Sequence, residues 1–464
     1  MALQPKNDVD FKDRISTVDS KGKRKWIYAL KPEGTWYNYR SYLSYFYLIV
    51  FFVLPFLSIN GSPILMFNFP KAEFVIFTVV FTPQDFVMFG LAMLTFIFII
   101  IVFTMIYGRL FCGWVCPQTV FLEMVFRKIE YLIEGNANIQ KLNDSKPFNL
   151  ERGVRKILKH LVFLFVSFLI SNTFLLYIIG KDEWLTLISD PLKYHIIGLI
   201  SILVFTLVFY TVFAFVREIV CTVVCPYGRL QGVLVDNNTL AVSYDSRRGE
   251  PRTKHKLDDQ QGDCIDCNLC VAVCPTGIDI RNGSSQLECT QCTACIDACN
   301  MMMLKVKRQP DLIKYASVNN IETNKNFNFT PRIKVFSGIL VALVALFVYI
   351  LATRTQIDSV VLKVPGQILQ TNQDGSVSNF YSLKLTNKGR KTIPISLSME
   401  DGIGTIEFVG QKIDSIEGGT KLDCLFFVRL EKNQIKEHKR QLELLIKSKD
   451  KILARKDLIF VEFL

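Results

Sequence analysis

Charged residues are scarce in this chain: Asp, Glu, Lys and Arg make up 21% of its 464 residues, whereas half of the residues are hydrophobic. This composition excludes a disordered chain and disfavours an ordinary soluble enzyme. The sequence has no glycine-rich phosphate-binding loop, Ser/His/Asp set or dinucleotide fingerprint. It has four histidines, and no helical segment carries a spaced histidine pair, which argues against haem bound within a membrane. These absences favour a membrane protein whose chemistry depends on another residue type.

Cysteine is that residue type. The chain has 13 cysteines, and twelve of them fall into regular spacings. A secreted scaffold held by disulfides would be much shorter than this chain. Metal or redox chemistry is therefore the expected use of the thiols.

Five apolar runs are long enough, at about 20 residues, to cross a bilayer, and none contains an internal charged residue. They cover residues 42–59, 86–107, 161–179, 196–216 and 335–352. A sixth stretch, residues 63–81, is interrupted by Pro70, Lys71 and Glu73, so we expect an interfacial or re-entrant piece there. The five runs predict an α-helical transmembrane bundle.

Basic segments alternate with neutral ones along the chain. Segments 1–40, 108–159 and 217–334 carry 9, 9 and 15 Lys or Arg residues, whereas segments 60–85 and 181–194 carry 1 and 2. The positive-inside rule therefore predicts a cytoplasmic N-terminus, with the residues after the fifth span outside the cytoplasm. The formal net charge of +12 is mostly this topology signal, so we expect no nucleic-acid partner.

The spans divide the chain into parts. We expect a basic cytoplasmic segment (1–40), a four-helix transmembrane region (41–244), a cytoplasmic insert (245–334) flanked by polar linkers at 246–256 and 317–332, a fifth transmembrane helix (335–353) and a C-terminal domain (354–464). Alternating β-branched runs in the last domain lie at 359–364, 379–385, 393–399, 405–409, 425–430, 441–446 and 451–463. They predict an all-β immunoglobulin-like sandwich. Its one cysteine, Cys424, is expected to be a small buried hydrophobe rather than a reactive thiol.

The insert holds the strongest motif of the chain, a C-x2-C-x2-C-x3-C spacing that occurs twice. In bacterial two-cluster ferredoxins with this spacing, the fourth cysteine of each run ligates the other cluster. The spacing predicts two [4Fe–4S] clusters, one held by Cys264, Cys267, Cys270 and Cys299 and the other by Cys289, Cys292, Cys295 and Cys274. Zinc is the alternative, but the spacing is poor for zinc.

Two details follow the second run. Asn300 stands where such a run usually has proline, which weakens the turn signal but removes no ligand. Met301, Met302 and Met303 come next, and we expect them to pack over a cluster rather than to bind copper.

A second motif, C-x3-C-P, follows the second and the fourth apolar run. Its cysteines are Cys112 and Cys116 in the first copy and Cys221 and Cys225 in the second. The two copies predict an internal repeat of two helical hairpins. On one helix, positions i and i+4 share a face, so each pair could place two sulfurs on one metal. Soft sulfur favours Cu(I), while another iron–sulfur centre, a dithiol/disulfide couple and simple packing are the alternatives.

Together these features resemble the cytochrome c oxidase accessory proteins called CcoG, FixG or RdxA, a family of membrane-bound polyferredoxins. The resemblance rests on the five spans, Cys112-Gly113-Trp114-Val115-Cys116-Pro117, the second C-x3-C-P at 221–226, the two-cluster insert and the C-terminal sandwich. It covers nearly the whole chain. The family's cluster ligands carry over onto the eight cysteines of the insert, and its C-x3-C-P motifs onto the four cysteines near the spans.

The resemblance implies a protein of the bacterial cytoplasmic (inner) membrane that helps to mature a cbb-type haem–copper oxidase by reducing Cu(II) to Cu(I). The implied partners are copper ions or a copper chaperone, and an oxidase subunit or assembly factors. Two other functions stay open. The chain could carry electrons between a quinol pool and a partner oxidoreductase without copper chemistry, or serve as an assembly scaffold with structural clusters.

Overall fold

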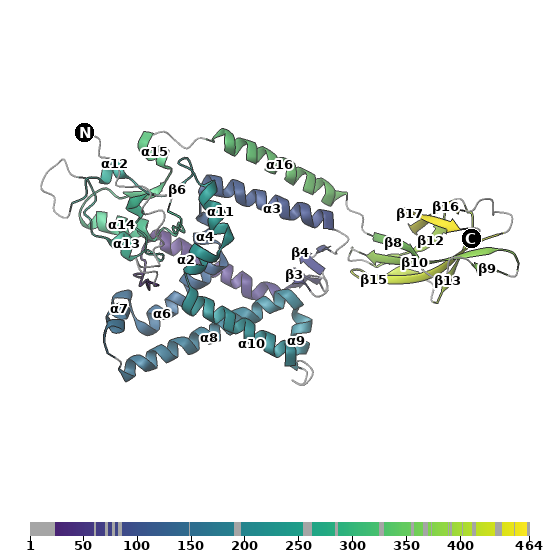
Figure 1. Ribbon diagram of the computed structural model, residues 1–464, viewed down its shortest axis with the longest axis horizontal. Helices are drawn as coiled ribbons and strands as arrows, with labels where there is room; N and C mark the ends of the chain where they lie inside the picture. Colours follow the sequence, from purple (N-terminus) through teal and green to yellow (C-terminus); the bar gives the residue numbers. More distant parts are fainter. Residues whose placement is uncertain are drawn as a thin grey trace. The chain divides into compact units, whose positions relative to one another are not determined.

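The computed structural model divides the chain into two compact units, each with buried cores of its own (Figure 1). The residues that it describes are 24–59, 62–69, 73–76, 79–81, 86–147, 149–189, 196–253, 262–283, 286–323, 329–353, 357–364, 370–372, 374–387, 389, 392–400, 402–410, 414–431, 439–449 and 451–461. One unit comprises Met1–Phe56 and Gly90–Ala345, and the other comprises Leu57–Phe89 and Leu346–Leu464.

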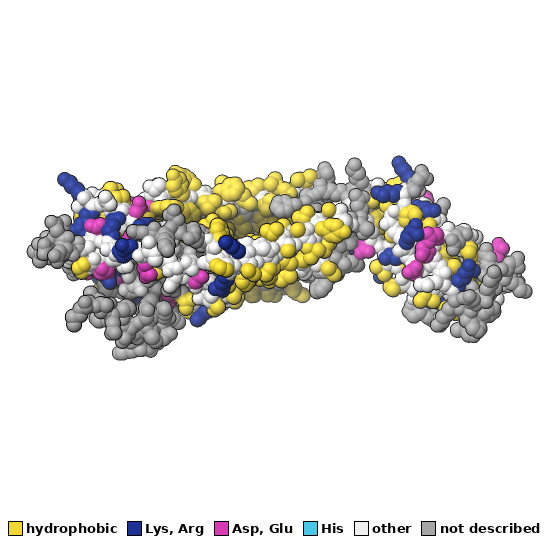
Figure 2. Space-filling view, turned by 90° about the horizontal axis from the view of Figure 1, so that it is seen from above, with side chains coloured by type: hydrophobic (Ala, Val, Ile, Leu, Met, Phe, Trp, Pro, Cys, Tyr) yellow, Lys and Arg dark blue, Asp and Glu magenta, His cyan; other side chains and the backbone are white. Residues whose placement is uncertain are grey.

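Five helices among the described residues are long and apolar enough to cross a membrane, which confirms the predicted bundle. They are α2 (Thr35–Val53, extended by the 3₁₀ turn η1, Leu54–Phe56), α3 (Phe86–Tyr107), α8 (Leu150–Ile179), α10 (Ile196–Thr211, continued by the π-helical η4, Val212–Val216) and α16 (Pro331–Ala352). Figure 2 shows hydrophobic side chains spread over the helical surface. Helix α8 begins before the apolar run at 161 because its basic first turns are ion-paired, for example Lys159 with Glu134.

Shorter helices connect the spans. They are α4 (Leu110–Trp114), α5 (Pro117–Val120), the π-helical η3 (Phe121–Phe126), α6 (Arg127–Glu134), α7 (Ala137–Ser145), α9 (Lys181–Ser189), the π-helical η5 (Val220–Val224) and α11 (Pro226–Leu234). An aromatic core joins η3, α8 and η4, where the rings of Phe126 and Phe213 stack with centroids 4.5 Å apart. Phe163 meets Phe126 edge-on at 4.9 Å. This packing fixes the region around both C-x3-C-P copies.

The insert is closed by two short strands. Strand β6 (Ala241–Tyr244) pairs antiparallel with β7 (Ile313–Ala316), and α12 (Ser246–Gly249), α13 (Leu269–Ala272), the 3₁₀ turn η6 (Ile280–Asn282) and α14 (Ala294–Lys305) lie between them in sequence. Pairing of β6 with β7 starts the insert before residue 245. The stretches expected as linkers contain α12 and α15 (Val318–Thr323). The Asp245 carboxylate caps α12 by accepting the Arg248 amide at 3.3 Å.

The C-terminal domain is an immunoglobulin-like sandwich of antiparallel sheets, as predicted. One sheet has the order β13-β15-β10-β8, with β9 beside β10, and further sheets have the orders β12-β16-β17 and β11-β14. The strands are β8 (Ile357–Lys363), β9 (Gln370–Thr371), β10 (Val377–Asn387), β11 (Ile393–Pro394), β12 (Ser396–Met399), β13 (Thr405–Val409), β14 (Ser415–Ile416), β15 (Lys421–Leu430), β16 (Lys439–Ser448) and β17 (Lys451–Val461). Each predicted run overlaps a strand, the run at 393–399 covers both β11 and β12, and the short β9 and β14 are additional. Residues 462–463 of the last run lie outside the described residues.

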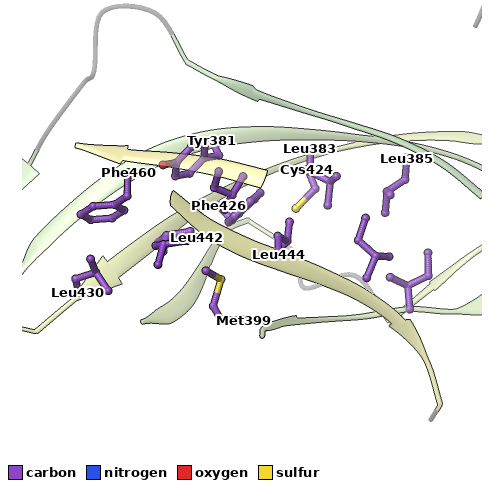
Figure 3. Packing of buried hydrophobic residues seen from close by; sticks show 14 of the residues in the cluster. Tyr381, Leu383, Leu385, Met399, Cys424, Phe426, Leu430, Leu442, Leu444 and Phe460 are labelled. Atoms are coloured by element: carbon purple, nitrogen blue, oxygen red, sulfur yellow. The ribbon is translucent and has the colours of Figure 1, made fainter. Parts of the chain in front are cut away.

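The sandwich core explains the alternation of its strands. Tyr381 of β10 and Phe426 of β15 point into the core with their rings 5.8 Å apart (Figure 3). Cys424 lies in the same core with 6% of its surface exposed, as expected for a small hydrophobe. Every second residue of these strands faces this core, which is the pattern that the sequence displays.

The stretch at 63–81 forms strands. Strands β3 (Leu65–Asn68), β4 (Glu73–Ile76) and β5 (Val79–Phe81) make an antiparallel sheet, and β1 (Ser58–Ile59) pairs with β2 (Ser62–Pro63). The ring of Phe74 stacks on Phe89 at 5.3 Å. Pro70 and Lys71, two of the residues that interrupt the apolar run, lie outside the described residues. The described part of this stretch contains no membrane-spanning helix.

Candidate metal centre

In each cysteine run of the insert, the second cysteine lies between two residues of left-handed backbone. These second cysteines are Cys267 and Cys292. The flanking residues and their φ angles are Asp266 (48°), Asn268 (58°), Gln291 (54°) and Thr293 (64°). Residues other than glycine adopt this conformation at an energetic cost, and residues in such strained conformations cluster at functional sites. The same coiled loop therefore occurs twice, once before α13 and once before α14.

One cavity of the insert is lined by the four cysteines that the spacing assigns to the first cluster. These are Cys264, Cys267, Cys270 and Cys299. The other lining residues are mostly apolar and include Met302 and Met303. The two methionines thus lie where packing over a cluster was expected. Four thiols around one apolar cavity fit a [4Fe–4S] cluster, whose ligands in proteins are cysteine thiolates.

The fourth cysteine of each run lies near the other run. The pKa of Cys299 is raised to about 12, first by burial and then by three nearby thiols, those of Cys270, Cys264 and Cys267. Burial and then the nearby thiol of Cys292 raise the pKa of Cys274. Burial also raises the pKa of Cys295, with Cys292, Cys289 and Cys274 as the next contributors. This grouping matches the predicted exchange of the fourth ligand, while ligation itself stays a prediction.

Asn300 has a structural explanation. It follows Cys299 inside α14, which continues to Lys305, so a proline there would interrupt the helix. In the first run Pro275 comes after α13 has ended. The Asn300 side chain instead donates to the Asp311 carboxylate at 3.2 Å and accepts the Asp311 amide at 2.8 Å.

Each C-x3-C-P motif breaks its helix at the second cysteine. Cys116 has φ −58° and ψ 123°, and Cys225 has φ −69° and ψ 115°, so both are extended residues that precede a new helix starting at proline. The expectation that both cysteines of a pair lie on one continuous helix is therefore wrong. The physical reason is that proline disfavours helical backbone in the residue before it and is well suited to the first position of a helix.

The fold brings the two copies of the motif together. The Thr119 hydroxyl, which follows Cys116, lies 4.0 Å from the Cys221 sulfur. Burial raises the pKa of Cys221 to about 12, and the next contributors include the thiols of Cys116, Cys112 and Cys225. Within the described residues, no three His, Cys, Asp or Glu side chains are arranged to hold a single metal ion. The four thiols thus lie near one another without forming a closed site.

Two polar residues beside Cys112 escaped the sequence analysis. The buried Arg109 donates from Nε to Gln231 Oε1 at 2.6 Å, and the Cys112 thiol donates to the same oxygen at 3.4 Å. A repeat gave a signal for this region: Tyr-Gly-Arg-Leu occurs at 107–110 and again at 227–230. The Arg109 guanidinium also lowers the pKa of Cys289, although burial dominates and the net effect is a rise to about 12. Arg109 thus lies near both Cys112 and a cysteine of the second group.

The insert packs directly on the first C-x3-C-P copy. A Cβ on Gly113 would lie 2.4 Å from the Thr290 carbonyl oxygen, so only glycine allows this approach. The Trp114 indole donates to the Gln291 carbonyl at 3.3 Å, and the Tyr315 hydroxyl donates to the same oxygen at 3.1 Å. The loop that precedes Cys292 therefore lies against the turn that carries Cys112. This contact explains the Gly-Trp between the two cysteines of the first motif.

Replacing Gly113 with valine should separate the insert from this turn. The added side chain collides with backbone, which cannot rotate away as a flexible side chain could. We expect faster alkylation of the buried Cys112 by maleimide, mapped by mass spectrometry, while the iron content stays unchanged because the eight cysteines of the insert are untouched. Gly90→Val is the matched control, since a Cβ on Gly90 of α3 meets nothing within 4 Å. Equal alkylation in both variants would contradict the tight contact.

Three family models match the chain. A 4Fe-4S dicluster domain matches residues 216–318, a 4Fe-4S binding domain matches 89–137, and the IG-like fold at the C-terminus of FixG matches 347–462. The first two matches each enclose one C-x3-C-P copy. The first also encloses all eight cysteines of the insert.

Whole proteins of similar sequence are known. The chain is 28% identical over 424 residues to nitrogen fixation protein FixG of Rhizobium meliloti, covering 82% of this chain and 80% of that protein. It is 33% identical over 335 residues to protein RdxA of Cereibacter sphaeroides, covering 69% of this chain and 68% of that protein. The chain belongs to the FixG/RdxA family. This FixG/RdxA protein is an iron–sulfur electron-transfer protein, and its described residues include five helices long and apolar enough to cross a membrane.

A crystal structure of a FixG-related protein from Vibrio parahaemolyticus is also similar. It covers 24% of this chain and 100% of its own, at 16% identity and a TM-score of 0.21.

Proposed function

We propose that this FixG/RdxA protein reduces Cu(II) to Cu(I) at the thiols of Cys112, Cys116, Cys221 and Cys225, and that the Cu(I) serves the maturation of a cbb-type haem–copper oxidase. The observation that carries the proposal is the contact of the 290–292 loop with Gly113. It sets the predicted ligands of the second cluster beside the turn that bears Cys112. A copper chaperone, oxidase subunit or assembly factor would be the partner.

The residues present divide the work. The eight cysteines of the insert would hold two [4Fe–4S] clusters, which supply one-electron carriers when bound. The four C-x3-C-P thiols would bind the copper substrate, and Cu(II) becomes Cu(I) by gaining one electron. Thiolate sulfur is a soft ligand that favours Cu(I), so binding by these thiols favours the reduced product. The buried pair of Arg109 and Gln231 holds the Cys112 sulfur in place.

The test uses purified full-length protein in detergent. Its clusters are reduced with dithionite, excess reductant is removed by desalting, and Cu(II) is added with a chromogenic Cu(I) chelator. We expect about two Cu(I) ions per chain, because each of the two reduced clusters gives one electron. The cluster absorbance, which is bleached by the dithionite reduction, should return at the same time. Clusters that stay reduced in Cu(II) but are reoxidised by a soluble quinone would contradict copper reduction and favour the quinol-linked electron carrier.

The proposed membrane orientation follows from the charge of the loops. The insert lies in the cytoplasm and the sandwich outside it, because the segments on the same side of the spans as the insert are rich in Lys and Arg. These segments are 1–40, 108–159 and 217–334, whereas segments 60–85 and 181–194 carry few basic residues. An alkaline phosphatase fused after Leu464 should be active in cells, whereas the same enzyme inserted at residues 254–261 of the sequence should be inactive. Reversed activities would contradict this orientation.

A further inference from the structure

We propose that a groove between α2 and α6 binds the phosphate headgroup of an anionic glycerophospholipid. This Tyr/Lys groove has a volume of about 460 Å³ and is open to the outside. Its lining includes Lys31, Tyr37, Ser41, Tyr42, Tyr45 and Lys128. The groove is separate from the cysteines described above, and nothing in the proposed copper chemistry requires it.

The Tyr/Lys groove holds two ammonium groups that have no anionic partner among the described residues. Lys128 Nζ donates to Tyr45 OH at 3.0 Å and to Ser41 Oγ at 3.3 Å, and it lies 5.3 Å from the centre of the Tyr37 ring. Within the described residues, neither Lys31 nor Lys128 forms an ion pair. The part of the lining that belongs to the described residues contains no Asp, Glu or His. The site therefore has positive charge and hydroxyl donors but no acidic group, which suits a phosphate.

Other basic side chains nearby are neutralised. Arg127 pairs with Glu123 at 3.1 Å, and Arg217 pairs with Glu130 at 3.1 Å. Lys128 follows Arg127 directly in the chain but points its charge into the groove. Within the described residues, Lys128 is thus a cation without an ion pair beside a cluster whose arginines are ion-paired, so its ammonium group is available to an anion from outside the protein.

The position of the Tyr/Lys groove identifies the kind of anion. It lies on the first turns of α2, one of the five membrane-length helices. Tyrosine and lysine are typical of the boundary between lipid and water. Next to the groove, α2 exposes 59% of Phe46 and 63% of Ile49, which offer a surface for acyl chains. Basic pockets at such a boundary bind anionic headgroups. A quinol is disfavoured because its oxidation needs a proton acceptor, and the described part of the lining has no carboxylate or imidazole.

A bound headgroup would also stabilise the contact between the insert and the spans. The first turn of α2 donates the amides of Trp36 and Tyr37 to the Asp297 carboxylate at 3.2 and 2.8 Å, and Asp297 lies between two cysteines of α14. One turn later, Arg40 Nε donates to the Gly113 carbonyl at 2.7 Å. The same helix end thus contacts the lipid groove, the insert and the first C-x3-C-P turn.

Native mass spectrometry of the delipidated full-length protein tests the proposal. Dioleoylphosphatidylglycerol, dioleoylphosphatidylcholine and inorganic phosphate are titrated separately. We expect phosphatidylglycerol to bind more tightly than both, and Lys31→Met and Lys128→Met each to weaken it about fivefold, as a lysine at an anionic surface does. Lys141→Met is the matched control, because Lys141 is an exposed residue of the neighbouring α7 outside the groove, and it should leave the affinity unchanged.

Three results would overturn the proposal. These are equal binding of the two lipids, inorganic phosphate binding as tightly as phosphatidylglycerol, and an unchanged affinity in the Lys31→Met/Lys128→Met double variant. Lys128→Met also removes hydrogen bonds to α2, whereas Lys31→Met does not, so loss of affinity in Lys31→Met alone separates charge from folding. Iron content and circular dichroism of each variant check that the chain is folded. Copper reduction is not part of the readout, so failure of the lipid site and failure of the copper proposal are distinguishable.

Discussion

Replacing Cys299 with serine should remove one cluster and leave the spectrum of the other cluster unchanged. A chain with two clusters holds about eight iron atoms, so the variant should lose about four of them. The cluster that disappears should be the one that Cys264→Ser also removes, because Cys299 lies with Cys264, Cys267 and Cys270 around one cavity. Iron analysis and low-temperature electron paramagnetic resonance of the reduced protein measure both effects.

The identity of the lost cluster is informative because proximity in sequence predicts loss of the other cluster. Cys299 is four residues from Cys295 and far in sequence from Cys264, so a run that bound its own four cysteines would lose the second cluster instead. Cys424→Ser is the control, since that cysteine lies in the sandwich core and should retain all iron. Loss of the spectrum that Cys289→Ser removes would contradict the exchanged ligand. Zinc in place of iron in the wild-type protein would contradict both clusters.

Local chemistry explains why much of this protein was predictable. A membrane span must be apolar over its whole length, and a sandwich strand must alternate, so both leave their period in the sequence. The span predicted at 196–216 and the strand predicted at 405–409 have the same bounds in the structure. Cluster spacing is equally local, since three thiols within seven residues must surround one face of a cluster.

Contacts between segments that are distant in the sequence produce no periodic pattern in it. Trp114 and Gln291 are 177 residues apart, and nothing in the pattern around Gly113 shows which backbone lies against it. The break at Cys116 is different, because the proline at 117 is a local signal for it. The i, i+4 spacing favoured one helix, whereas the proline at 117 restricts the cysteine before it, and the local backbone preference prevailed.

The Tyr/Lys groove could not be predicted from the sequence either. Its lysines belong to segments counted only for their charge in assigning topology, and a count cannot distinguish Lys128 from the ion-paired Arg127 beside it. That distinction requires the positions of the carboxylates on neighbouring helices.

Replacing Cys112 or Cys225 with serine should abolish copper reduction while both clusters remain. A serine oxygen is a hard ligand and does not favour Cu(I), so the site loses both affinity and preference for the reduced ion. Neither residue lies in the two cysteine runs of the insert, so iron should stay at about eight atoms per chain. Reduction is followed with the Cu(I) chelator after cluster pre-reduction, and copper binding is measured separately by equilibrium dialysis.

The control and the contrary outcomes separate the alternatives for these thiols. Cys424→Ser removes a buried cysteine outside the site and should reduce copper at the wild-type rate. If all four variants, at Cys112, Cys116, Cys221 and Cys225, bound and reduced copper normally, the thiols would be packing residues. If they lost iron instead, the thiols would be cluster ligands, as the match of a 4Fe-4S binding domain to residues 89–137 allows. Retained iron with lost reduction is the outcome that assigns copper to the C-x3-C-P turns, because the first of these turns lies against the loop that carries Cys292.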